Sequence, residues 1–205
     1  MARELKYQVI TIGREYGAYG KTLGAALSEA LGIPYYDKDL MRKVAEESGY
    51  SLDEIHKSGE QMSKATNFMN NFLNTMDAYV SSIDAIHNAE IEVIKKLAQN
   101  PCILIGRCAD QVLRKEGISC FNIFLYADLA YRVAHAAELS ENKGITGSAL
   151  VKEVEKKSAG RATYYKHYTG KDIHSLSNYH ICLDVGEIGV EKCREIILDL
   201  VTKPE

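Results

Sequence analysis

The segment 17–22 holds two glycines and ends in Gly-Lys-Thr, the tripeptide that closes phosphate-binding loops. In such loops the backbone N–H groups at a helix start surround phosphate oxygens, and the lysine reaches the β- and γ-phosphates. The threonine hydroxyl is a ligand for Mg²⁺, which phosphate oxygens and water complete. The segment therefore predicts a site for ATP and Mg²⁺, with Thr22 as the metal ligand and Gly17, Ala18, Tyr19, Gly20, Lys21 and Thr22 around the phosphates.

The loop departs from the usual pattern because Glu15 stands where its first glycine is expected. A carboxylate beside phosphates would repel them. We therefore expect Glu15 to turn outward, to pair with Arg14, or to help organise the hydrated metal. Read alone, the tripeptide also fits a glycine turn with a solvated lysine, but its place between a β-rich run and a helical pattern favours phosphate binding.

A second candidate element is the run Gly106-Arg107, which follows the strand-like residues 103–105. Ligands of parallel sheets bind at the carboxyl ends of strands, so Arg107 is placed to hold an anion. A surface arginine in the first turn of a helix is the alternative, and it would oppose the helix dipole. Asp110 follows three residues later, where acidic residues are common at helix starts in any case.

The segment before the last strand-like run is rich in lysine, arginine and tyrosine. A solvated helix face is one interpretation. Beside a phosphate loop, however, a basic flap supplies the positive charge that phosphoryl transfer needs once water is excluded. Arg161 is the first candidate within this flap, and Arg132 is the second.

The elements that must position these residues follow from the apolar pattern. Residues 21–31 have helical spacing, residues 38–100 are almost entirely helical, and five short apolar runs separated by helices predict a parallel α/β sheet. A basic stretch at 140–172 has little apolar mass and is expected to be a mobile excursion. The five strand-like runs are 9–13, the brief run before Asp37, 102–106, 121–126 and 179–184.

Composition restricts the class of protein. The 205 residues fit one domain, and a net charge of −3 from 25 basic and 28 acidic residues disfavours nucleic acid as a partner. The five cysteines form no C-x-x-C pair, which is typical of reduced thiols. No apolar run approaches the ~20 residues that span a bilayer. We therefore expect a cytoplasmic protein without a membrane partner.

Three segments together resemble the cytidylate kinase-like family: 10–17 (ITIGREYG), 32–40 (GIPYYDKDL) and 105–110 (IGRCAD). In that family an I-[ST]-x-R-E-[YF]-G loop replaces the strict pattern, so Glu15 looks like a family feature. The resemblance implies a P-loop NTPase-type three-layer fold whose parallel sheet has the order 2-3-1-4-5. It also implies one domain, 1–205, with a helical acceptor-binding insertion at about 50–100 and a lid at about 142–172.

The resemblance also implies roles for individual residues. Lys21 and Thr22 match the phosphate loop, Arg107 matches an arginine at a strand end, and Arg161 looks like a lid arginine. The aspartate that follows the strand-end arginine in true cytidylate kinases is Cys108 here, so CMP is a family label. The residues expected around the phosphates are Lys21, Arg107, Arg132 and Arg161, and those expected at the acceptor are Asp37, Arg42, Arg107 and Asp110.

Three functions remain open. The first is ATP-dependent phosphoryl transfer to a nucleoside monophosphate, with CMP or dCMP as acceptor. The second keeps ATP and uses another small molecule as the acceptor. The third is a nucleotide-binding regulatory protein without efficient turnover, in which an apolar patch between residues 68 and 76 would meet a partner, although such a patch is more often core or the seam of a homodimer.

Overall fold

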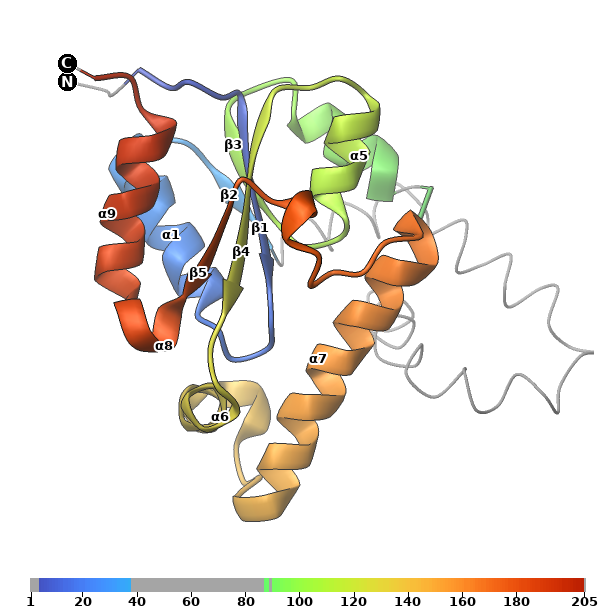
Figure 1. Cartoon of the computed structure of the whole chain (residues 1–205), viewed down its shortest axis with the longest axis vertical. Helices are drawn as coiled ribbons and strands as arrows, with labels where there is room; N and C mark the ends of the chain where they lie inside the picture. Colours follow the sequence, from blue (N-terminus) through green and yellow to red (C-terminus); the bar gives the residue numbers. More distant parts are fainter. Residues whose placement is uncertain (1–3, 38–86, 89, 205) are drawn as a thin grey trace, which may run out of the picture.

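The computed structural model describes residues 4–37, 87–88 and 90–204 (Figure 1). Its centre is a five-stranded sheet with the order β2-β3-β1-β4-β5, in which every neighbouring pair is parallel. The predicted α/β class and strand order are therefore confirmed. The strands are β1 (Val9–Arg14), β2 (Tyr35–Tyr36), β3 (Cys102–Ile105), β4 (Cys120–Tyr126) and β5 (Ile181–Asp184).

The strands are continuous apolar runs because helices cover both faces of the sheet. In the central strand, Ile12 pairs in register with Ile105 of β3 and with Ile123 of β4. All three side chains are buried. The carboxyl end of β1 thus lies between the carboxyl ends of β3 and β4. A loop that follows β1 can therefore contact residues at the ends of both neighbouring strands.

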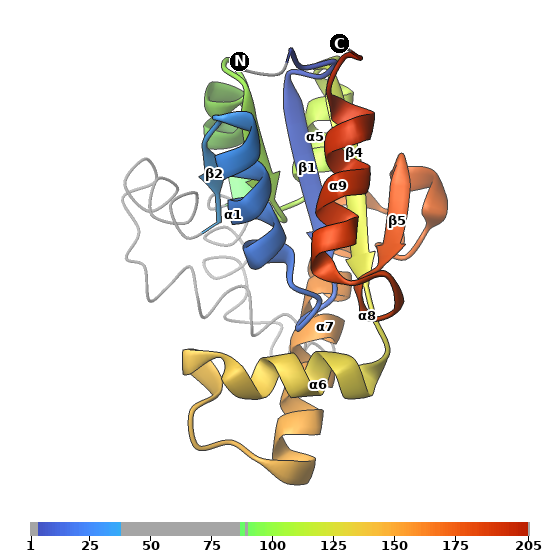
Figure 2. The same cartoon turned by 90° about the vertical axis from the view of Figure 1, so that its left-hand side faces the viewer.

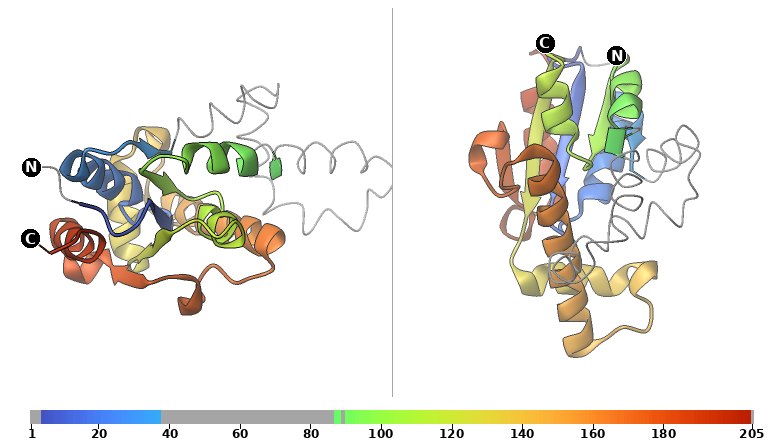
Figure 3. Two further views of the ribbon diagram at one scale, coloured as in Figure 1. Left: turned by 90° about the horizontal axis from the view of Figure 1, so that it is seen from above. Right: turned by 90° about the vertical axis from the view of Figure 1, so that its right-hand side faces the viewer.

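Two helical layers enclose the sheet (Figures 2 and 3). On one face, α1 and α9 pack Leu27 and Ile197 against the strands. On the other face, α5 and a helical segment that includes residues 90–97 pack Leu113 and Ile94. The helices of these layers are α1 (Gly20–Leu31), α5 (Ala109–Lys115), the short α8 (Val185–Ile188) and α9 (Val190–Val201).

Of two further helices, α6 (Leu129–Glu138) lies beyond the carboxyl ends of the strands, whereas α7 (Gly147–Thr169) begins there and runs back toward α5 (Figure 1). Short 3₁₀ turns, Ser140–Asn142 and Leu176–Asn178, flank α7. At a rise of 1.5 Å per residue, the 23 residues of α7 span about 35 Å.

The predicted excursion at 140–172 is therefore built around one continuous helix. Near the start of α7, Leu150 packs with Tyr16 of the glycine-rich loop. Near its end, Tyr165 packs with Phe124 of β4. Both halves of α7 thus contact the rest of the chain, and the expected mobility of this segment stays a prediction.

Most of the expected acceptor-binding insertion falls on residues 38–86. Arg42 and the apolar patch at 68–76 lie there too, outside the described residues, so the insertion and its homodimer seam stay predictions. Within the described residues, none of the helices is long and apolar enough to cross a membrane.

Candidate functional site

The loop between β1 and α1 has the backbone of an anion site. Gly17 (φ 85°) and Tyr19 (φ 55°) are left-handed, and Gly20 begins α1. A Cβ at Gly17 would overlap the carbonyl oxygen of Arg132, so only glycine fits there. Tyr19 provides no side-chain cap, and the first turn of α1 holds no acidic residue. The N–H groups at this helix start are therefore open to an anion.

Lys21 and Thr22 occupy the first turn of α1, and both side chains are exposed. Within the part of the chain that the structure describes, no ion pair involves Lys21. The same part contains no group of three or more His, Cys, Asp or Glu side chains that could hold a metal ion. One hydroxyl beside an open helix start fits Mg²⁺ that arrives with nucleotide phosphates, because Mg²⁺ commonly takes one or two protein ligands there.

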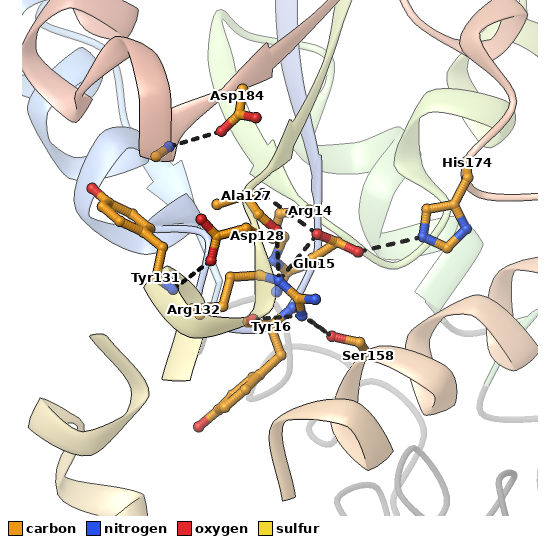
Figure 4. Close-up of polar contacts among 12 residues, drawn as sticks. Arg14, Glu15, Tyr16, Ala127, Asp128, Tyr131, Arg132, Ser158, His174 and Asp184 are labelled. Carbon is orange, nitrogen blue, oxygen red and sulfur yellow. Dashed lines mark hydrogen bonds and ion pairs between the residues drawn. The ribbon is translucent and has the colours of Figure 1, made fainter. Parts of the chain in front are cut away.

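Glu15 faces Arg132, as Figure 4 shows. Its Oε2 lies 3.2 Å from Arg132 Nε and 3.5 Å from the backbone nitrogen of Ala127. Its Oε1 lies 3.8 Å from His174 Nε2. The side chain is 18% exposed, so it does not turn outward, and the pairing with Arg14 that was among our expectations is not found.

Arg132 is held from several sides. Its Nε donates to the carbonyl oxygen of Ala127 at 3.0 Å, and its Nη1 donates to Ser158 Oγ at 3.0 Å and to the carbonyl oxygen of Tyr16 at 3.4 Å (Figure 4). Ser158 Oγ also accepts from the backbone nitrogen of Tyr16 at 3.1 Å. The structure thus places Arg132 beneath the loop, where it joins the loop, the end of β4 and α7.

Arg14, the last residue of β1, was not among the predicted site residues. Its Nη2 lies 3.6 Å from Asp37 Oδ1 at the end of β2. A Cβ at Gly20 would lie 2.9 Å from Arg14 Cγ, and a Cβ at Gly106 would overlap Arg14 Nη1. The side chain therefore runs from the phosphate loop to the end of β3. Its place at the carboxyl end of the first strand is the signal that could have identified it.

Arg107 lies in a left-handed turn before α5, which begins at Ala109. Gly106, Arg107 and Cys108 have φ values of 83°, 55° and 57°. Two consecutive non-glycine residues in this region are strained, a feature that concentrates at functional sites. The turn directs the Arg107 guanidinium toward Glu90, whose Oε1 lies 3.2 Å from Arg107 Nη1.

Glu90 is a second residue that the sequence did not reveal. Its side chain is 1% exposed, and its Oε2 accepts a hydrogen bond from the hydroxyl of Tyr164. Glu90 Oε1 accepts no hydrogen bond, and its ion pair among the described residues is the one with Arg107. The Arg107 guanidinium also lies 5.2 Å from the centre of the Tyr164 ring, so α7 covers this pair.

Arg161 completes a cluster of three arginines with Arg14 and Arg107. Its Nη1 lies 3.4 Å from the carbonyl oxygen of Arg14, to which it donates. Burial, and next the charge of Arg14, lower the pKa of Arg161 to about 9. Burial also lowers the pKa of Arg14, which Asp37 partly offsets. Like charges in a buried cluster are stabilised by an anion, so this edge of the sheet favours one.

Asp110 lies in a different environment. It is buried, and its Oδ2 accepts from the hydroxyl of Tyr165 at 2.5 Å and from Gln111 Nε2 at 2.7 Å. Burial raises the pKa of its carboxyl group above the ordinary value. The structure thus places Asp110 in a contact between α5 and α7.

Tyr16 connects the loop to the flap on the other side. Its hydroxyl donates to Glu141 Oε1 at 2.6 Å and accepts from Asn142 Nδ2 at 2.9 Å and from Lys157 Nζ at 3.1 Å. The Arg161 guanidinium lies 5.2 Å from the centre of the Tyr16 ring. The loop and α7 are therefore joined through side chains that the motif alone did not identify.

Comparison with known proteins gives a consistent result. The model of the cytidylate kinase-like family matches residues 9–187. A protein named cytidylate kinase from Methanothrix thermoacetophila is 28% identical over 179 residues, which cover 87% of this chain and 88% of that protein.

Solved structures agree on the fold. An uncharacterized protein from Eubacterium ventriosum superposes with a TM-score of 0.69 at 22% identity, covering 95% of this chain and 98% of that one. Shikimate kinase from Bacteroides thetaiotaomicron superposes with a TM-score of 0.56 at 14% identity, covering 94% and 97%. At these identities the likeness shows the fold alone.

Proposed function

Because this chain belongs to the cytidylate kinase-like family, we propose that it is an ATP-dependent kinase that transfers a phosphoryl group to a nucleoside monophosphate. CMP and dCMP are the first acceptors to test. The observation that supports this most directly is the convergence of two anion-binding features on one sheet edge. These are the open start of α1 with Lys21, and the buried arginine cluster at the ends of β1 and β3.

The proposed reaction breaks the bond between the γ-phosphorus and the oxygen that bridges it to the β-phosphate. A new bond forms between the γ-phosphorus and a phosphate oxygen of the acceptor, so the products are ADP and a nucleoside diphosphate. No proton must be removed from an acceptor phosphate dianion, so positioning and charge neutralisation suffice. Lys21, Arg107 and Arg161 supply the positive charge in this proposal.

The remaining predicted residues take supporting roles. Arg132 holds the loop in place, since its described contacts are to the protein. Asp110 would fix α7 through Tyr165, and Asp37, which pairs with Arg14, stays a predicted acceptor residue. Arg42 stays a predicted acceptor residue. Bound Mg²⁺ would offset phosphate charge, with the Thr22 hydroxyl as its ligand from the protein.

A second candidate is a kinase of another small acceptor, and one observation favours it. Cys108 follows Arg107 where true cytidylate kinases have an aspartate, and its buried thiol can hardly replace a carboxylate as a hydrogen-bond acceptor. Burial also raises the pKa of this thiol, so it stays uncharged. The departure lies on the acceptor side and leaves the ATP side intact.

An acceptor screen tests the proposal. ADP release is followed with ATP and Mg²⁺, and with CMP, dCMP, UMP, AMP, GMP or shikimate added singly. Reactions without an acceptor give the baseline. A rise above this baseline with CMP or dCMP supports the proposal, whereas a rise only with a molecule that is not a nucleotide supports the second candidate. ATP binding without turnover for any acceptor would contradict both kinases and favour a regulatory protein.

A further inference from the structure

Arg14 occupies a position between the two halves of the proposed site. It ends the central strand, beside the Glu15 that Figure 4 shows turned toward Arg132. Its aliphatic part passes Gly20, the first residue of α1. Its guanidinium contacts Gly106, the residue directly before Arg107. A Cβ at Gly20 would press on the stem of this side chain, and a Cβ at Gly106 would displace its guanidinium from the observed position. The two glycines thus leave room for the Arg14 side chain to extend from the loop before α1 to the turn that holds Arg107.

The charge around Arg14 is not balanced within the described residues. Asp37 is the carboxylate paired with it, and the 3.6 Å between Asp37 Oδ1 and Arg14 Nη2 is too long for a good hydrogen bond. The neighbouring Glu15 is engaged by Arg132. Arg107 has its own partner in Glu90, yet its charge still lowers the pKa of Arg14. The charge of Arg14 in turn lowers the pKa of Arg161, which forms no ion pair with a described carboxylate.

We propose that Arg14 binds the phosphoryl group that is transferred, and contacts its oxygens between Lys21 on the donor side and Arg107 on the acceptor side. This inference rests on the proposed function for the identity of the reaction. As the bond to the β-bridging oxygen breaks and the bond to the acceptor oxygen forms, Arg14 keeps its proton. It donates hydrogen bonds to oxygens that carry charge throughout.

An arginine suits this position better than a lysine. A planar guanidinium can contact Asp37 with one edge and two phosphate oxygens with another, whereas an ammonium acts as a point charge. Asp37 would then orient Arg14. The opposing interpretation is that Arg14 and Asp37 form a structural pair that joins β1 to β2 and touches no substrate.

The experiment compares the affinities of ATP and ADP, because ADP lacks the γ-phosphate. Calorimetry with Mg²⁺ is carried out on the full chain and on Arg14→Gln, Arg14→Lys and Asp37→Asn. Arg194→Lys is the matched control, since Arg194 also pairs with a carboxylate, that of Glu191, but lies on α9. Circular dichroism and melting temperature verify that each variant is folded.

We expect Arg14→Gln to weaken ATP by about tenfold or more relative to ADP, the usual effect of losing a charged hydrogen bond. Arg14→Lys should keep part of this preference, and Arg194→Lys should keep all of it. Asp37→Asn removes only the group that orients Arg14, so it should lose less of the preference than Arg14→Gln does. With an accepted acceptor, kcat at saturating substrates should fall by about tenfold or more in Arg14→Lys.

An unchanged ratio of ATP to ADP affinity in folded Arg14→Gln would overturn the inference, and so would a larger loss of that ratio in Asp37→Asn than in Arg14→Gln. The readout does not depend on the acceptor. If the parent protein phosphorylates nothing in the screen, the proposed function fails while the ATP and ADP affinities still decide the role of Arg14.

Discussion

Glu15 Oε2 lies 3.2 Å from Arg132 Nε. The carboxylate that stands in place of the loop's first glycine is therefore neutralised by an arginine of α6. Both side chains are largely buried, at 18% and 11% exposed. This pair explains how a phosphate loop tolerates a carboxylate in its backbone turn. Its negative charge is directed away from the helix start and toward an arginine.

We expect Glu15→Gln to lower the free energy of unfolding by about 1–3 kcal/mol, because it leaves a largely buried guanidinium without its ionic partner. Arg132→Met should cost more, since it also removes the bonds to Ser158 and Tyr16. Urea denaturation of both variants and of the double variant measures the coupling, with exposed Glu29→Gln as the control. Purely additive losses would show that the pair does not act as a unit.

Lys21→Met should leave the melting temperature near that of the parent, because the lysine side chain is exposed. Its kcat should fall by about 100-fold or more, since the charge that it neutralises grows during transfer. Lys192→Met is the control, an exposed lysine on α9 that pairs with Glu195. Equal kcat in Lys21→Met and the parent at saturating ATP would remove the phosphate loop from the mechanism.

Arg107→Lys tests the acceptor side. Lysine keeps the charge opposite Glu90 but loses the bidentate geometry, so the KM of the acceptor should rise. The value of kcat/KM for the acceptor should fall by a factor that corresponds to about 1–3 kcal/mol. The KM of ATP should change little. Steady-state kinetics with each substrate varied separately measures both, and loss of ATP affinity with unchanged acceptor affinity would reverse the assignment.

The raised pKa of Asp110 predicts a pH dependence of stability. A carboxyl group whose pKa is higher in the folded protein binds protons more tightly there, so stability is lost as pH rises through the folded pKa. Asp110→Asn cannot ionise, so its stability relative to the parent should improve as pH rises from about 4 to 7. Urea denaturation across this range measures it, with exposed Asp199→Asn as the control. Parallel pH profiles for Asp110→Asn and the parent would contradict the prediction.

Residues 142–172 should exchange amide hydrogens faster without nucleotide than with a bisubstrate analogue that joins adenosine to cytidine through phosphates. Closure would exclude water and hold Arg161 against the phosphates. Hydrogen exchange monitored by mass spectrometry compares this segment with α9, which serves as the internal reference. Equal protection of the segment in both states would contradict its role as a lid.

The sequence was sufficient for the strands and for the loop, because continuous apolar runs and a Gly-Lys-Thr ending have few structural solutions. The strand order came with the family resemblance. Of the three expectations for Glu15, pairing with Arg14 is not found because Glu15 directly follows Arg14, the last residue of β1, and neighbouring side chains of an extended chain point in opposite directions. Arg14 therefore reaches Asp37, and Glu15 reaches Arg132.

Glu90 could not be predicted in the same way. It lies in a helical segment without a motif, and its importance arises only when the turn at Arg107 brings the two charges together. The contacts of Asp110 and Arg132 likewise depend on how distant segments of the chain come together. Their hydrogen bonds go to Tyr165 and Ser158, residues of α7 whose positions a linear pattern does not reveal.

The hydrogen bond between Tyr165 and Asp110 would set the pivot if α7 moves as the predicted lid. Arg161 precedes Tyr165 by four residues, about 6 Å along the helix axis, whereas the start of α7 at Gly147 is about 27 Å away. If the helix pivots where Tyr165 is fastened, its far tip sweeps through an arc more than four times longer than the arc of Arg161. A movement of the start of α7 that is wide enough to admit substrates would then displace the Arg161 guanidinium only slightly. The positive charge of Arg161 would stay close to the phosphates.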